Sequence, residues 1–218
     1  MKTWINVTML VLVSLAMVLT VRGRSLNVET KTSWPPAFCN GLDCPKYTVL
    51  DNNHTTWEER FYDVSQWVGT SSHGMDLDTA TREMFMKLFD YIEGANKQGV
   101  TVEMAAPVLV KATINEKEGT LFNNFTMFFY LPFIYQNATA PSPSDPEVFL
   151  WTKPCHTAFV RSFPGYTSAK KDLLNTGALA MDLQDKWSYD HRYFYYAGYD
   201  SPWHIIDRHN EIWFVGTK

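Results

Sequence analysis

The sequence has little cysteine and little charge, and it lacks the short motifs that mark most enzymes. Only 3 of its 218 residues are cysteine, and 19% are charged. It contains no Gly-x-Ser-x-Gly elbow, no phosphate-binding glycine loop and no dinucleotide fingerprint. Its acidic residues are scattered, without a pair placed for acid–base catalysis. We therefore expect a protein that is not an enzyme.

Runs of basic residues are also missing, and the formal net charge is −4. A protein that binds nucleic acid needs positively charged side chains to contact the phosphate backbone. We therefore expect no nucleic-acid partner. Beyond residue 23 no apolar run is long enough to cross a bilayer, so the remaining chain is expected to have no stable membrane span.

The first 23 residues predict a signal peptide and hence a secreted, extracellular protein. Lys2 supplies a positive start, residues 5–21 are mostly apolar, and the small residues Val21 and Gly23 suit a cleavage site. The alternative is an uncleaved anchor, because the apolar run approaches the roughly 20 residues that span a bilayer. Cleavage near Gly23 is favoured because polar residues interrupt the run: Asn6, Thr8 and Ser14.

Three Asn-x-Thr sequons follow, at Asn53, Asn124 and Asn137. Behind a signal peptide they predict N-glycosylation, and glycan acceptors must be exposed. Asn124 is the weakest of the three because it precedes a strongly apolar segment.

The three cysteines are Cys39, Cys44 and Cys155, and an odd number leaves one unpaired within the chain. Cys39 and Cys44 flank a four-residue loop and can bridge locally, and a Cys44–Cys155 bridge is the alternative. No spacing of cysteine and histidine around them matches a zinc site.

Patterning predicts strands and helices in the order strand–strand–helix–strand–strand, occurring twice. The first part has strands at 47–50, 57–62, 66–71, 100–114 and 125–131, one more than this order contains, with a helix at 76–96. The second has strands at 148–151, 157–163, 193–198 and 211–215, with a helix at 167–184. Two such halves, each with a helix over a four-stranded antiparallel unit, predict an α+β fold with a shared core.

The helix at 76–96 is apolar over more than one face. One stripe faces a sheet, and it consists of Leu77, Ala80, Met84, Leu88 and Ile92. Phe85, Met86 and Phe89 widen that stripe on one flank, with Arg82 among them. Either another part of the protein covers this flank, or a flat apolar ligand does, with Arg82 at its polar edge.

Several short motifs occur in the order found in one known family. They are the segments at 59–62 (ERFY), 91–96 (YIEGAN), 103–108 (EMAAPV), 129–132 (FYLP), 159–163 (FVRSF), 197–202 (AGYDSP) and 210–213 (NEIW). On these motifs the chain resembles the SOUL haem-binding family, and the resemblance extends from about residue 44 to residue 214.

The resemblance implies a distorted antiparallel barrel of eight to nine strands, built from two ββαββ halves with two flanking helices. This domain would span 46–218, behind a leader at 24–45 in which Cys39 and Cys44 match a cysteine pair of secreted relatives. The implied ligand is haem or free porphyrin in a shallow hydrophobic site beside the first helix. Arg82 would meet a propionate, and Phe85, Met86 and Phe89 the macrocycle.

One departure concerns the iron. Some relatives have a histidine, proposed as an axial ligand, at the position held here by Phe61. Binding would then rest on apolar contacts, with Phe61 among them, and His73 is a weak candidate for the metal. The sequence thus predicts a secreted tetrapyrrole carrier or scavenger. The alternative is an extracellular interaction protein that kept the fold and lost the ligand.

Overall fold

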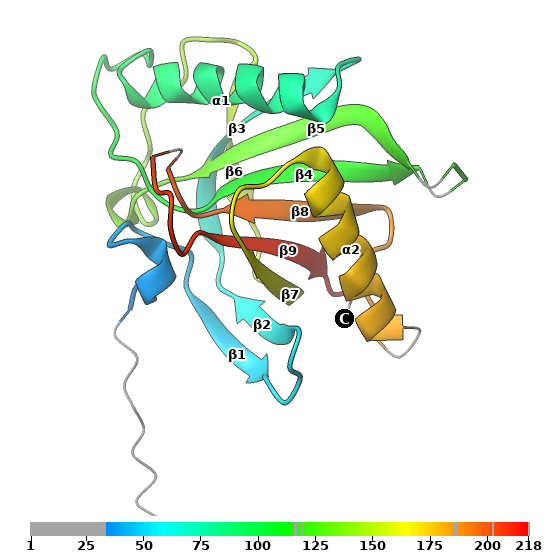
Figure 1. The fold of residues 1–218 in the computed structure, drawn as a ribbon. Coiled ribbons are helices and arrows are strands. Elements are labelled where there is room, and N and C mark those ends of the chain that lie inside the picture. The colour runs from blue at the N-terminus through cyan, green and yellow to red at the C-terminus, as the bar shows by residue number, and fades with distance from the viewer. Residues whose placement is uncertain (1–33, 116, 119, 185–186, 202, 218) are drawn as a thin grey trace, which may run out of the picture. The chain divides into compact units, whose positions relative to one another are not determined.

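Nine antiparallel strands and two α-helices form the part of the chain that the computed structural model describes, residues 34–217 without 116, 119, 185, 186 and 202 (Figure 1). The strands are β1 (Tyr47–Asp51), β2 (Glu58–Tyr62), β3 (Ser65–His73), β4 (Val108–Asn115), β5 (Thr120–Tyr130), β6 (Val148–Lys153), β7 (His156–Pro164), β8 (Tyr193–Gly198) and β9 (His209–Val215). The helices are α1 (Leu77–Ile92) and α2 (Ala169–Leu183), with 3₁₀ turns η1 (Ala37–Cys39) and η2 (Phe133–Tyr135). The predicted α+β fold is confirmed, and the predicted signal peptide lies outside the described residues.

The sheet order shows the predicted duplication. The strands run β1-β2-β7-β9-β8-β4-β5-β3-β6, all antiparallel. Reading outward from the central β8–β4 pair, β9-β7-β2 on one side match β5-β3-β6 on the other. Strand β1 extends the edge beside β2 and has no counterpart in the second half. With β1 set aside, each half sends its first strand to pair with the other half, β2 with β7 and β6 with β3. This exchange makes the two halves one structural unit.

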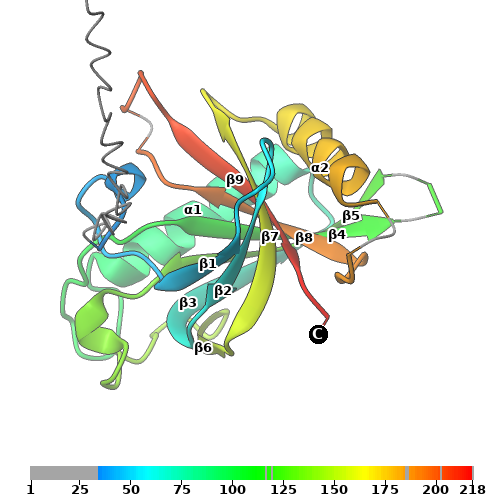
Figure 2. The ribbon, with the colours of Figure 1, turned by 90° about the horizontal axis from the view of Figure 1, so that it is seen from below.

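The sheet curls, and the two helices cover one of its faces. Figure 2 shows the strands splayed around this curl. Helix α1 packs on β3 and β5, and α2 packs on β7 and β9. Neighbouring strand residues alternate between faces, so Ile212 and Phe214 join the core beneath the helices while Trp213 joins a second core on the opposite face. Among the described residues, no helix is long and apolar enough to span a membrane.

Helix α1 is fixed at both ends by local sequence. The Asp76 carboxylate accepts the Thr79 N–H at 3.0 Å and caps the first turn. Beyond Ile92 the chain leaves the helix, and Gly94 adopts a φ of 114°, which favours glycine. The helix is therefore shorter than the predicted 76–96.

The predicted strand at 100–114 begins only at Val108, because the preceding backbone groups bond elsewhere. The Asn96 amide donates to the Val100 carbonyl at 2.7 Å, and the Val102 N–H donates to the Ile92 carbonyl at 2.8 Å. Pro107 has no N–H to offer to a sheet. Residues 100–107 consequently pass from the end of α1 to the start of β4 as an extended connection.

Candidate functional site

An apolar cavity of about 370 Å³ lies where α1, the start of β4 and the β8–β9 connection meet. A volume of this size falls within the roughly 300–1,000 Å³ typical of ligand sites. Its walls are formed by Leu42, Phe85, Phe89, Met104, Ala105, Ala106, Val108, Gly198, Tyr199, Asp200, Ser201 and Trp203.

One wall is the wide flank of α1. The ring centroids of Phe85 and Phe89 lie 5.9 Å apart with planes 14° from parallel, and Phe85 also contacts Phe129 at 5.2 Å. The helix directs its stripe of fully buried residues to the sheet, so these two rings remain only partly buried. Their exposed surface faces the cavity. The cavity is therefore bordered by the apolar surface of α1 that the sheet does not cover.

The floor of the cavity exists because its residues are small. Val108 of β4 pairs with Gly198 of β8, and Ala105 and Ala106 precede Val108. A Cβ at Gly198 would lie 2.8 Å from the Tyr196 hydroxyl oxygen, so Gly198 lets the Tyr196 side chain lie close against this end of the sheet. Larger residues at these positions would close the hollow.

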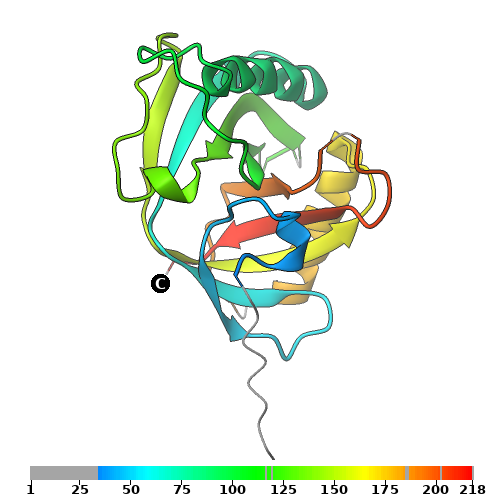
Figure 3. The same cartoon turned by 90° about the vertical axis from the view of Figure 1, so that its left-hand side faces the viewer.

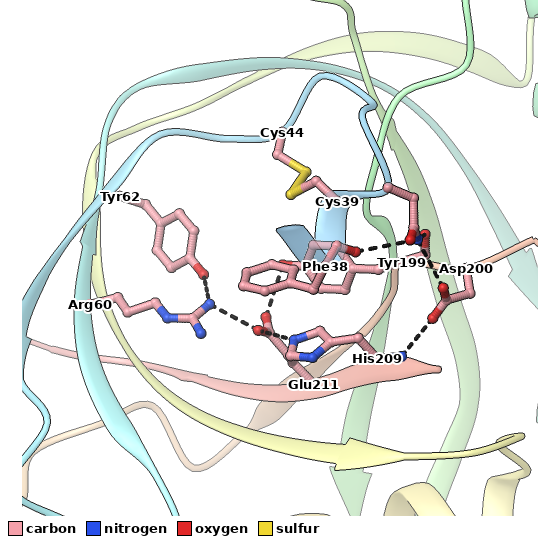
Figure 4. The surroundings of a disulfide bond; sticks show 10 residues. Phe38, Cys39, Cys44, Arg60, Tyr62, Tyr199, Asp200, His209 and Glu211 are labelled. Atoms are coloured by element: carbon pink, nitrogen blue, oxygen red, sulfur yellow. Dashed lines mark hydrogen bonds and ion pairs between the residues drawn. A yellow bond between two sulfur atoms is a disulfide. The ribbon is translucent and has the colours of Figure 1, made fainter. Parts of the chain in front are cut away.

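A disulfide loop contributes to the outer rim, and its backbone follows the 3₁₀ turn η1 (Figure 3). The loop is hydrogen-bonded to the β8–β9 connection, and Figure 4 shows the disulfide and its surroundings. Cys39 and Cys44 are bridged, with Cα atoms 6.4 Å apart, and Cys155 is free and exposed. Within the loop, the Asn40 amide donates to the Asp200 carboxylate at 2.8 Å, and Leu42 lines the cavity. The local pairing predicted as one of two alternatives is therefore confirmed.

Next to the rim lies a buried polar network (Figure 4). The Arg60 guanidinium and the Glu211 carboxylate lie 3.0 Å apart and are 2% and 0% exposed. Glu211 also accepts hydrogen bonds from Tyr199 at 2.9 Å and Trp213 at 2.7 Å, and His209 lies 2.7 Å away. Because Tyr199 itself lines the cavity, the network fixes one of the walls.

The charge of Glu211 is maintained by these partners. Burial raises the pKa of its carboxyl, but Arg60, His209 and Trp213 outweigh burial and lower it to about 2. The His209 ring stacks on Phe38 with centroids 4.2 Å apart and planes 12° from parallel. The network thus joins β2, β9 and the disulfide loop.

A second cavity of about 190 Å³ lies over β4 and β8, nearer the start of α1. It holds Asp172 of α2, a side chain only 4% exposed that accepts a hydrogen bond from Thr167. Burial raises the pKa of Asp172 to about 6, although the Thr167 hydrogen bond opposes this. Both cavities therefore border α1 and share strands β4 and β8.

Comparison with known proteins gives a family match. A family model described as SOUL heme-binding protein matches residues 42–215. The chain belongs to the SOUL family. It is 35% identical to heme-binding protein 2 of Homo sapiens over 162 residues, covering 73% of this chain and 78% of that protein. It is 32% identical to heme-binding protein 2 of Mus musculus over 180 residues, covering 80% and 86%.

Other similarities are more distant. Heme-binding protein 1 of Xenopus laevis is 27% identical over 165 residues, covering 76% of this chain and 86% of that protein. The crystal structure of the EcmrR C-terminal domain superposes with a TM-score of 0.54 at 12% identity, covering 78% of this chain and 96% of that domain. At that identity the likeness concerns the fold alone.

The structure brings some of the predicted ligand residues of this SOUL family member together. Phe85 and Phe89 both line the larger cavity. Arg82 is exposed and is not among the lining residues, but it lies on the same flank because it precedes these rings by three and seven residues. Met86 is 51% exposed and is not among the lining residues.

Phe61 and His73 also lie outside the cavity walls. Phe61, on β2, is 37% exposed and pairs with Thr157 of β7. His73 is exposed at the end of β3, where it pairs with Asn124 of β5. No histidine lines the larger cavity, and the described residues contain no group of three metal-binding side chains.

The sequence did not point to most of the wall. The segment 103–108 and the segment 197–202 both contribute to the cavity, and both had been noted only as family motifs. Their small residues, Ala105, Ala106 and Gly198, were the available signal. Small residues at the ends of two apolar strands indicate a close approach or a hollow, but they do not distinguish these.

The three sequon asparagines are exposed, as predicted. Asn53 precedes β2, Asn124 lies within β5, and Asn137 follows η2. The Asn53 amide donates to Asp51 at 2.8 Å. Glycosylation at these positions stays a prediction.

Proposed function

We propose that this chain is a secreted protein that binds haem or free porphyrin in the cavity beside α1, and that it carries or scavenges the tetrapyrrole. The observation that carries the proposal is the apolar cavity walled by two stacked phenylalanine rings, in a chain whose relatives are named heme-binding proteins. A flat macrocycle suits a wall of aromatic faces. The predicted signal peptide, the exposed sequons and the disulfide support secretion.

The residues present fit a porphyrin held by apolar contact. Haem would supply an iron centre, but among the residues that the structure describes no histidine lines this cavity to ligate the iron. Met104 is a wall residue of a type that ligates haem iron in other proteins. Affinity would come from burial of the macrocycle against Phe85 and Phe89. Arg82, exposed on the same flank, would offer a guanidinium to a propionate.

The main test is a titration with haemin and with iron-free protoporphyrin IX. We expect saturable binding of both, with dissociation constants within about threefold of each other, because apolar burial carries most of the affinity. Soret absorbance follows haemin, and quenching of tryptophan fluorescence follows both ligands. Absence of saturable binding at micromolar protein refutes the proposal. Binding of haemin alone would assign the affinity to the iron.

A second prediction concerns the polar edge. We expect Arg82→Ala to weaken haemin binding about 3- to 10-fold, the loss of one exposed charge-assisted contact. His73→Ala should leave the affinity unchanged, because His73 lies at the end of β3, paired with Asn124, and not on the flank of α1 that carries Phe85 and Phe89. The same Soret titration measures both variants. A larger loss of haemin affinity in His73→Ala than in Arg82→Ala would indicate iron ligation by His73.

The alternative, an interaction protein without a ligand, predicts that protein covers the flank of α1 completely. Phe85 and Phe89 are only partly buried and border a cavity. This geometry favours the ligand-binding function.

A further inference from the structure

The β8–β9 connection exposes three large apolar side chains within four positions. Trp203 is 87% exposed, Ile205 75% and Ile206 72%. Single exposed apolar residues are ordinary on soluble proteins, whereas a cluster of them marks an interaction surface. We call Trp203, Ile205 and Ile206 the apolar tip.

The shape of this connection is held by one buried cation. The Arg208 guanidinium donates to the carbonyl oxygens of Ser201 at 2.6 Å, His204 at 2.7 Å and Asp200 at 3.3 Å. Arg208 is 9% exposed and lies 4.5 Å from the ring centre of Tyr166. These bonds fix the backbone on the protein side, so the side chains of the apolar tip project outward.

The apolar tip adjoins the larger cavity. Trp203 lines that cavity together with Asp200 and Ser201 of the same connection. A surface that contacts the tip is therefore next to the rim of the proposed ligand site.

We propose that the apolar tip inserts into the surface of a zwitterionic phospholipid bilayer. Three side chains are too few for a stable protein–protein interface, which uses about 20–30 residues on each side. Insertion into a bilayer needs no complementary partner surface, and tryptophan concentrates at the membrane–water interface. The whole chain has a net charge of −4, Asp207 is exposed and Arg208 is buried, so attraction to anionic lipid is not expected.

Bilayer contact beside the cavity would let a tetrapyrrole, which is itself amphipathic, pass between membrane and protein. This role rests on the proposed function. The contact itself rests only on the exposed residues, so it can be tested without ligand.

The test uses residues 24–218, which include the compact unit of residues 33–218 and omit the apolar segment at the start of the chain. Ligand-free protein is mixed with phosphatidylcholine vesicles and separated by flotation. We expect a measurable partition coefficient that is unchanged by 0.5 M salt and not increased by anionic lipid. Ile205→Ser with Ile206→Ser should lower it about tenfold or more, because two inserted side chains are lost.

Ile134 provides a matched control. It is 72% exposed on η2 and is not among the cavity-lining residues, so Ile134→Ser removes a similar exposed side chain from another place. We expect this variant to partition like the wild type. Equal losses in both variants, or no binding of the wild type at millimolar lipid, would overturn the proposal.

Haemin affinity separates the two proposals. Neither Ile205 nor Ile206 lines the cavity, so the double variant should bind haemin in solution as the wild type does. Vesicle binding without haemin binding would leave the apolar tip supported and the proposed function refuted. Haemin binding without vesicle binding would support the proposed function and refute bilayer insertion of the apolar tip.

Discussion

Arg60→Met should lower the free energy of unfolding by about 3–5 kcal/mol, the usual effect of removing one partner from a buried ion pair. The reason lies in Glu211, which is 0% exposed and which would keep its charge with fewer partners. Methionine fills a similar volume, so the loss reports the charge and its hydrogen bonds more than packing. Urea unfolding at pH 7, followed by tryptophan fluorescence, measures the change.

The pH dependence of this loss identifies its cause. In the wild type the pKa of Glu211 is about 2, below its ordinary value of 4.5, so its contribution to stability is present above about pH 4.5 and is lost as the pH falls toward 2. In the variant, burial is opposed less and the pKa of Glu211 rises. Glu211 then takes up a proton on mild acidification, which relieves the uncompensated charge. The difference in the free energy of unfolding between the wild type and Arg60→Met should therefore become smaller as the pH falls below about 5.

Arg192→Met is the matched control. Its guanidinium pairs with Asp190 at 2.6 Å, but its side chain is 80% exposed. An exposed pair contributes only about 0–1 kcal/mol. A loss as large in this control as in Arg60→Met would contradict the assignment. So would an Arg60→Met loss that stayed constant between pH 7 and pH 3.

The order of strands and helices could be predicted because it depends on local patterning. Strands β8 and β9 and both helices were located to within a few residues, and the duplicated order was confirmed by the sheet. The error at 100–107 comes from competing hydrogen bonds with the end of α1. Those residues are apolar enough for a strand, but Asn96 and the end of α1 take their backbone hydrogen bonds.

The cavity was predictable on one side only. The excess apolar arc of α1 is visible in the sequence, so Phe85 and Phe89 could be named before the structure was known. The opposite wall comes from segments far apart in the chain, including Leu42, Val108 and Tyr199. Val108 and Tyr199 meet because β4 pairs with β8, which places Val108 opposite Gly198. Leu42 joins them through the Cys39–Cys44 loop, where Asn40 bonds to Asp200, a contact between residues about 160 positions apart that no local pattern encodes.

Removing both rings from the α1 wall should weaken haemin binding about 30-fold. Each ring offers one partly exposed side to the ligand and is expected to contribute about 1 kcal/mol, so Phe85→Ala with Phe89→Ala loses about 2 kcal/mol. Soret titration measures the dissociation constant. Met86→Ala is the neighbouring control, since Met86 is 51% exposed and does not line the cavity, and its affinity should equal that of the wild type.

Phe85 packs on Phe129, so the double alanine variant also loses core contacts and must be compared at a temperature well below its unfolding transition. A second variant avoids this loss because it fills the cavity and keeps both rings. Val108→Trp instead places an indole in the 370 Å³ space while Phe85 and Phe89 stay. If tetrapyrrole occupies this cavity, both variants lose affinity and Met86→Ala does not. If the ligand instead lies over the exposed outer side of α1, Met86→Ala weakens binding while Val108→Trp leaves it unchanged.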